Sequence, residues 1–143
     1  MWIICGLATS RWRDVQLYRT PWGWIPAGIV FAGGLWIYRS SGAGFGARQL
    51  GGIPEVLEGD HRQQLVTSGI RSHVRHPIYL GHFCEMLAWS LGTGLAVCYG
   101  LAAFALITGV IMIRLEDAEL EKRFGGEYQA YRKKVPALLP RMR

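Results

Sequence analysis

Residues 78–113 form an apolar region whose only acidic side chain is Glu85 and which contains no Lys or Arg. Such a region is too long for one helical crossing, which takes about 20 residues for a hydrocarbon core of about 30 Å. Gly92 and Gly94 interrupt it, and glycine allows the backbone conformations that tight turns require. We therefore expect two membrane-embedded helices that form a hairpin.

A second uncharged stretch, residues 22–38, reads WGWIPAGIVFAGGLWIY and is long enough for another span. The start of the chain, MWIICGLATS, has a short apolar segment followed by Arg11 and Arg13. A secretory signal would place basic residues first and a longer apolar centre after them, so we interpret this start as a short, partly inserted helix. An interfacial belt is expected from Arg11, Trp12, Arg13, Trp22 and Trp24.

Composition supports lipid as the solvent of this chain. Of its 143 residues, 50% are hydrophobic, six are Trp, and the mean hydropathy is positive, which is too apolar for an ordinary soluble domain of this size. The expected fold is all-α, a polytopic helical membrane protein with three to four membrane-embedded helices. We predict one domain, 1–143, with N-terminal membrane helices (1–38), a polar connector (39–68) and a helical core with a C-terminal tail (69–143).

The 16 Lys and Arg residues are unevenly placed: five lie in 39–77, eight in 114–143 and three in 11–19. A hairpin that crosses twice puts the two richer segments on one side, which the excess of positive charge makes cytoplasmic. Nucleic-acid binding is not expected, because the basic residues flank apolar segments instead of lining one face. Cys5, Cys84 and Cys98 lie in apolar segments without a CxxC spacing, which indicates packing roles.

The connector contains Gly42, Gly44 and Gly46 in a GxGxG pattern. A dinucleotide-binding turn needs a buried strand before the glycines and a crossover helix after them, within a parallel sheet. Here an expected membrane helix comes before them and no set of parallel strands is predicted. We interpret these glycines as a flexible loop.

The segment SGIRSHVRHPIYLGH, residues 68–82, precedes and enters the apolar hairpin. Pro77 suits the first turn of a helix because its missing N–H would be unpaired there. Arg75 and His76 would then lie at a positive helix N-terminus, where an anion is favoured. That anion could be a ligand, a headgroup phosphate or a protein carboxylate. A metal site built from His73, His76, His82 and Cys84 is not expected, because their spacings do not converge.

A second polar cluster follows the hairpin in residues 114–140. Gly125 and Gly126 are expected to end the helix that leaves the membrane. Ion pairs on a solvated helix end explain the charged residues Glu119, Glu121, Lys122 and Arg123. Glu119 is expected to pair with Lys122 or Arg123, three or four residues later. Glu116 and Asp117 lie close to the membrane boundary, where carboxylates need a cationic partner: Arg75, Arg114 or a cationic ligand.

Together these segments resemble the isoprenylcysteine carboxyl methyltransferases and the wider group of membrane methyltransferases that includes phospholipid N-methyltransferases. The resemblance covers about residues 65–140 and rests on an ordered set of motifs. These are Gly69, Arg75-His76-Pro77-Ile78-Tyr79-Leu80-Gly81, Glu116-Asp117-Ala118-Glu119-Leu120, Phe124-Gly125-Gly126-Glu127-Tyr128-Gln129-Ala130-Tyr131, Val135-Pro136 and Pro140.

The resemblance implies that S-adenosylmethionine binds at the cytoplasmic face, between the RHPxY segment and the acidic helix end. The implied acceptor is lipid-soluble: a prenylcysteine-like carboxylate, a phospholipid amine or a hydrophobic thiol. The chain departs from the family at Ile70-Arg71-Ser72, at Asp117, and at Met112, where members often carry a basic residue. The implied catalytic residues are Arg114, Glu116 and Asp117, and the implied cofactor-binding residues are Arg75, His76, Pro77, Tyr79, Gly81, Glu116, Tyr128 and Tyr131.

Two alternatives remain open at this point. Membrane sterol reductases share a similar C-terminal pattern and use NADPH, but Ile78, Phe124 and Tyr128 stand where their motifs differ. A small helical membrane protein without enzymatic activity is the other alternative, although polar residues gathered at one membrane face are costly without a ligand. The motifs do not settle the oligomeric state.

Overall fold

The computed structural model describes residues 14–42 and 64–139, and every regular element within these ranges is helical. The confirmed all-α architecture contains three long helices: α2 (Trp24–Gly42), α5 (Pro77–Thr93) and α6 (Ala96–Phe124). Short elements flank them: η1 (Pro21–Gly23), η2 (Gly69–Ser72) and α7 (Gly126–Lys134). The short helix expected at the start of the chain and the loop expected at Gly44 and Gly46 lie outside the described residues.

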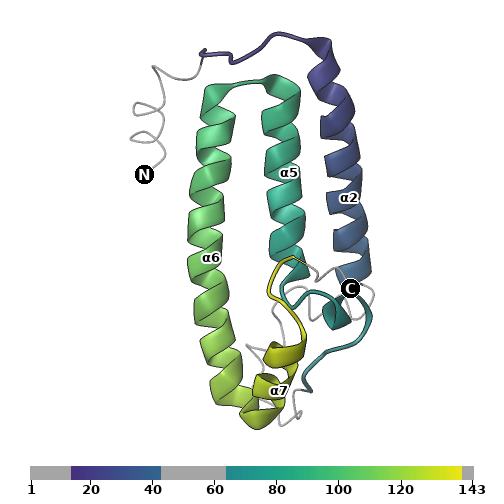
Figure 1. The fold of residues 1–143 in the computed structure, drawn as a ribbon, viewed down its shortest axis with the longest axis vertical. Helices are drawn as coiled ribbons and strands as arrows, with labels where there is room; N and C mark the ends of the chain where they lie inside the picture. Colours follow the sequence, from purple (N-terminus) through teal and green to yellow (C-terminus); the bar gives the residue numbers. More distant parts are fainter. Residues whose placement is uncertain (1–13, 43–63, 140–143) are drawn as a thin grey trace, which may run out of the picture.

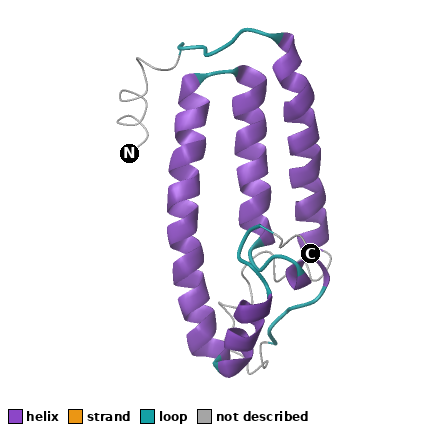
Figure 2. Ribbon diagram, viewed as in Figure 1, coloured by secondary structure: helices purple, strands orange, loops and turns teal. Residues whose placement is uncertain are grey.

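The three long helices stand side by side, with α5 between α2 and α6 (Figure 1). α5 and α6 form the expected hairpin, and α7 folds back from the far end of α6 toward the start of α5 (Figure 2). The start of α5, the end of α2 and the end of α6 therefore lie at the same end of the molecule. The described basic residues of 39–77 and 114–139 thus share that end, as the sequence predicted.

Helix boundaries fall at the residues that the sequence indicated. α5 begins at Pro77, where the fixed φ of proline suits a first turn. It ends before Gly94, which has φ +65°, in the left-handed region that glycine adopts without steric cost. α6 ends before Gly125, which has φ +55°. Both turns thus require a residue without a Cβ.

By length and apolar composition, α6 is the one helix of the described residues that qualifies as a membrane span. α5 has 17 residues, and α2 has 19 but contains no 18-residue stretch as apolar as that of α6. Three to four embedded helices therefore remain a prediction. Large apolar side chains are exposed along all three long helices, including Ile29, Leu87 and Phe104.

Small residues allow α2 and α5 to approach closely. Ala27, Gly34 and Ser41 recur every seven residues on α2 and are buried. Gly34 meets Cys84 and Gly81 of α5, a Cβ added to Gly81 would lie 3.1 Å from the Tyr38 ring, and one added to Gly92 would lie 2.6 Å from the Trp24 ring. Such contacts stabilise helix pairs in membranes, because close packing replaces the hydrophobic effect there.

At the hairpin end, the chain before α2 crosses over the turn between α5 and α6. The backbone N–H of Leu17 donates to Gly94 O over 2.8 Å, and that of Ala96 donates to Val15 O over 2.9 Å. The Tyr18 hydroxyl donates to Leu91 O over 2.6 Å and lies 2.9 Å from the Tyr99 hydroxyl. Trp22 and Trp24 are exposed at this end, consistent with an interfacial position.

The contact between α2 and α5 leads to a matched pair of substitutions. A Cβ at Gly34 would lie 3.0 Å from Cys84 Cβ and 3.2 Å from Gly81 O, whereas one at Gly33 would have no neighbour within 4 Å. Gly34→Ala should destabilise the protein by about 1–3 kcal/mol, and Gly33→Ala should leave it unchanged or stabilise it by up to about 1 kcal/mol. Thermal unfolding in detergent measures both, and equal midpoints would contradict this packing.

Candidate functional site

The candidate site lies where the start of α5 meets the end of α6, α7 and the segment that follows α7. Two backbone hydrogen bonds join this segment to the residues before α5: Arg75 N–H to Pro136 O at 2.9 Å and His76 N–H to Ala137 O at 3.0 Å. Val135, which precedes Pro136, is buried. The Val-Pro motif near the C-terminus therefore holds the RHP segment in place.

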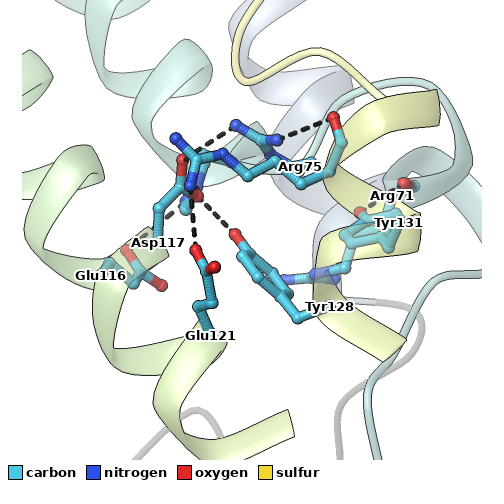
Figure 3. A network of polar contacts seen from close by, with 9 residues as sticks. Arg71, Arg75, Glu116, Asp117, Glu121, Tyr128 and Tyr131 are labelled. Atoms are coloured by element: carbon cyan, nitrogen blue, oxygen red, sulfur yellow. Dashed lines mark hydrogen bonds and ion pairs between the residues drawn. The ribbon is translucent and has the colours of Figure 1, made fainter. Parts of the chain in front are cut away.

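Asp117 is the centre of this site (Figure 3). Its Oδ2 accepts a hydrogen bond from Arg75 Nη2 at 2.9 Å, and its Oδ1 lies 2.7 Å from His76 Nε2 and accepts another from the Tyr128 hydroxyl. The exposed fractions are 4% for His76, 4% for Asp117 and 1% for Tyr128. We call Arg75, His76, Asp117 and Tyr128 the Asp117 cluster. It joins α5, α6 and α7 through buried charges.

The environment of His76 favours its charged form. Burial lowers the pKa of His76, but the hydrogen bonds and negative charges of Glu116 and Asp117 outweigh it, so the pKa lies above the usual 6.5. The pKa of Tyr128 is raised by burial and by its hydrogen bond to Asp117, so its hydroxyl keeps its proton. The cluster thus holds two cationic groups against one buried carboxylate.

Glu116 lies on the open side of the cluster. Its Oε2 is 3.5 Å from His76 Nδ1, and its side chain is 47% exposed. The ring of Tyr79 stands edge-on to the His76 ring, with 5.9 Å between centroids. Of the two adjacent acids, Asp117 is thus neutralised by protein groups, and Glu116 offers a carboxylate to solvent or a ligand.

A second layer of contacts surrounds the cluster. Arg132 of α7 binds Glu121 of α6 over 3.1 Å, and Arg75 Nη1 donates to the Arg132 carbonyl over 3.2 Å. The Tyr131 hydroxyl donates to Arg71 O over 2.6 Å, and Arg71 Nη1 donates to Ser41 O at the end of α2 over 3.3 Å. Contacts at this end of the molecule therefore connect all three long helices.

The structure confirms one predicted ion pair at the end of α6 and corrects the assignment of another acidic residue. Glu119 pairs with Arg123 four residues later, with 3.6 Å between charged atoms, as expected. Glu121 was assigned to the same solvated helix end, but it binds Arg132 and Gln129 of α7. The turn at Gly125 reverses the chain and brings α7 alongside α6, and no periodicity within α6 indicates that.

The structure brings most of the predicted site residues together. Seven of them lie in or beside the Asp117 cluster: Arg75, His76, Tyr79, Glu116, Asp117, Tyr128 and Tyr131. Pro77 is buried at the start of α5. Gly81 packs against Tyr38 on the α2 side of α5, so helix packing accounts for it. Arg114 is exposed. It lies two positions before Glu116 on α6, and side chains two positions apart on a helix differ in direction by about 200°, so Arg114 points away from Glu116.

Asp117 takes Arg75 as its partner, one of the three that the sequence left open. Arg75 and His76 bind a protein carboxylate, which was likewise one of the alternatives. Sequence reasoning did not anticipate the Tyr128 hydroxyl as a third ligand of the same carboxylate. Within the described ranges no group of three His, Cys, Asp or Glu side chains could hold a metal ion.

Comparison with known proteins gives a family and several relatives. The family described as phospholipid methyltransferase matches residues 24–127. Protein-S-isoprenylcysteine O-methyltransferase of Schizosaccharomyces pombe is 39% identical over 83 residues, which cover 53% of this chain and 33% of the relative. Methanethiol S-methyltransferase 2 of Bradyrhizobium diazoefficiens is 36% identical over 69 residues, 48% of this chain and 26% of the relative.

A relative of a different kind is Delta(14)-sterol reductase of Mus musculus, which is 34% identical over 76 residues, 52% of this chain and 18% of the relative. In these three relatives the matched region spans a third of the protein or less. Their names therefore describe proteins much longer than the part they share with this chain.

Removing the charge of Asp117 should unfold this end of the molecule. Asp117→Asn leaves the buried guanidinium of Arg75 without its carboxylate and leaves His76 with only Glu116, and loss of one partner of a buried ion pair typically costs about 3–5 kcal/mol. Glu119→Gln breaks only an exposed pair and should cost less than about 0.5 kcal/mol. Thermal or denaturant unfolding in detergent compares the two, and a small effect of Asp117→Asn would show that the cluster does not hold the helices together.

The raised pKa of His76 makes stability depend on pH. Its contribution to stability is complete below the unfolded pKa of about 6.5 and is lost as pH rises through the higher pKa of the folded protein. As pH rises above about 6.5, the unfolding midpoint should therefore fall more steeply in the natural protein than in His76→Gln. All other titrating groups are shared, so parallel curves would show that His76 is not charged in the fold.

Proposed function

Because the chain belongs to the phospholipid methyltransferase family, we propose that it transfers a methyl group from S-adenosylmethionine to a lipid-soluble acceptor at the cytoplasmic face of a membrane. The family match confirms the resemblance that the ordered motifs indicated. The cofactor, the acceptor and the membrane face are parts of the proposal, because the relatives are much longer than the matched region.

The half-exposed carboxylate of Glu116 carries the proposal. It lies beside a buried cationic pair, so it stays ionised without being fully neutralised. S-adenosylmethionine has an ammonium and a sulfonium that such a carboxylate attracts, and the aromatic ring of Tyr79, next to His76, offers a face to either cation. The residues present therefore fit the positively charged part of this cofactor.

The start of α5 fits its negatively charged part. No side chain of the described residues caps this helix, and the first N–H groups of a helix lack acceptors within it. The N–H groups of Ile78 and Tyr79 are thus suited to the cofactor carboxylate. His76 N–H is already used by Ala137 O.

The Asp117 cluster has a positioning role in this proposal. Arg75 and His76 are buried against Asp117, so they orient Glu116 and the start of α5 instead of contacting a ligand themselves. Tyr128 anchors α7 to the same carboxylate, and Tyr131 packs edge-on against Tyr128 with 6.0 Å between ring centroids. Tyr131 is the less buried of the two and is the better placed to contact an adenine ring.

When bound, S-adenosylmethionine supplies an electrophilic methyl group on sulfur. The residues of this chain then need only align the acceptor, exclude water and allow the acceptor to lose a proton, because alignment accounts for much of the rate of such displacements. Glu116 is an exposed carboxylate at this site and would receive that proton. Arg114 lies on another side of α6 and would serve an acceptor that approaches from there.

The acceptor is proposed to enter from the bilayer along the apolar part of α6. Met112, exposed on α6, stands one turn before Glu116, so no basic side chain at that position is available for an acceptor carboxylate. This leaves amine and thiol acceptors better supported than a prenylcysteine acid. The basic residues at the end of the molecule that carries the site support a cytoplasmic orientation.

The decisive measurement is calorimetric titration of the detergent-purified protein with S-adenosylmethionine, S-adenosylhomocysteine and NADPH. We expect saturable binding of the first two and none of NADPH. Glu116→Gln should weaken binding of S-adenosylmethionine at least tenfold, since it removes the carboxylate that faces the ammonium, and Glu119→Gln should leave binding unchanged. NADPH binding alone would favour the reductase function, and binding of none of the three would overturn the proposal.

A further inference from the structure

The chain that leaves the Asp117 cluster is strongly basic. Residues 128–143 contain five Lys or Arg and no Asp or Glu. Among them, Lys133 and Lys134 form the end of α7, and the structure describes the chain that follows as far as Leu139. We call residues 133–139, which read KKVPALL, the KKVPALL segment.

Backbone contacts fix the depth of the KKVPALL segment along the helices. The Arg75 N–H donates to Pro136 O over 2.9 Å, and the His76 N–H donates to Ala137 O over 3.0 Å. Arg75 and His76 directly precede Pro77, where α5 begins. The segment therefore lies beside the start of α5, toward which α7 folds back from the far end of α6 (Figure 1).

This depth coincides with the end of the apolar part of α6. Residues 96–113 of α6 carry no charged side chain and extend about 27 Å at 1.5 Å per residue, close to a hydrocarbon core of about 30 Å. Asp117 follows one turn later, and its Oδ1 lies 2.7 Å from His76 Nε2. With α6 as the membrane span, the KKVPALL segment lies at the level of the lipid headgroups.

The side chains of the KKVPALL segment form an inner and an outer set. Val135 is buried against the molecule. Lys133 and Lys134 are exposed, and neither has a hydrogen bond or an ion pair among the described residues. Leu139 is 75% exposed. The outer set thus presents two ammonium groups and an apolar side chain to the surroundings, whereas the preceding Arg132 is bound to Glu121 over 3.1 Å.

We propose that the KKVPALL segment binds anionic lipid headgroups, with Lys133 and Lys134 against their phosphate groups and Leu139 in the apolar layer beneath. An anionic leaflet attracts a nearby Lys with a gain in affinity of roughly fivefold, and no acid in residues 128–143 opposes it. Apolar side chains beside such a basic group enter the boundary of the acyl region. A soluble polyanion would satisfy the lysines alone, and neutral lipid would satisfy Leu139 alone.

Lipid binding at this segment would reach the site through the backbone. The hydrogen bonds to Pro136 O and Ala137 O that fix the segment also hold Arg75 and His76 in place. A ligand that binds only the docked segment stabilises the docked arrangement. Anionic lipid should therefore order the Asp117 cluster. This inference concerns the membrane surface and does not depend on the reaction that the protein catalyses.

Lipid titration of the protein in neutral detergent tests the binding. Dioleoylphosphatidylglycerol should raise the unfolding midpoint saturably, whereas dioleoylphosphatidylcholine and inorganic phosphate should not. Lys133→Gln combined with Lys134→Gln should raise the half-saturating lipid concentration at least tenfold. Lys122→Gln is the matched control, because it removes an exposed lysine from the last turn of α6, away from the membrane, and it should leave this concentration unchanged.

Leu139→Ser should also weaken the binding, by a factor of about three or more. A loss confined to the lysine variant would indicate a soluble acidic partner and refute the proposal. Equal responses to the two lipids, a response to phosphate, or equal effects of the control and the lysine variant would overturn it too. Unchanged circular dichroism shows that the variants fold.

Amide hydrogen exchange in lipid nanodiscs tests the coupling. Replacing part of the phosphatidylcholine by phosphatidylglycerol should slow exchange of the Arg75 and His76 amides at least threefold, because these amides bind the KKVPALL segment. Leu17 and Ala96, whose amides form similar backbone hydrogen bonds at the hairpin end, are the internal controls and should not change. The combined lysine variant should lose the difference. Equal exchange in both lipids, or equal slowing at both ends of the molecule, would contradict the coupling.

Discussion

The negative charge of Asp117 is buried at the point where α5, α6 and α7 meet, and a buried carboxylate is tolerated only when its partners satisfy it. Arg75, His76 and Tyr128 do so from two other segments of the chain. The ends of the helices can therefore adopt only the arrangement that brings all three groups to one carboxylate. A single charge thus determines where the RHP segment, the acidic helix end and α7 lie.

The Asp117 cluster gives the two adjacent acids, Glu116 and Asp117, different environments. Asp117 is buried and bound to Arg75, His76 and Tyr128, whereas Glu116 is half-exposed and lies 3.5 Å from His76. His76 contacts both carboxylates, and its raised pKa keeps a positive charge between them. In the proposed function, these contacts would orient the carboxylate of Glu116, a common way to hold a functional group in one position.

Packing farther from the site relies on small residues instead of charge. α2 and α5 approach closely at Gly34, and the Tyr38 and Trp24 rings of α2 pack against Gly81 and Gly92 of α5, where a Cβ would clash. The three long helices form a layer, which leaves two broad faces of α5 uncovered by the described residues (Figure 1).

Local sequence signals by themselves determined the helical class, the hairpin and the helix ends, because Pro77, Gly94 and Gly125 act through their own backbone preferences. The motifs also predicted that the RHP segment and the acidic pair belong to one site. Only the tertiary structure decided that Asp117 is buried and Glu116 exposed, because adjacent residues on a helix point about 100° apart and the direction of α5 is not encoded locally. The roles of Glu121 and Gly81 were likewise decided by which helix packs on which face.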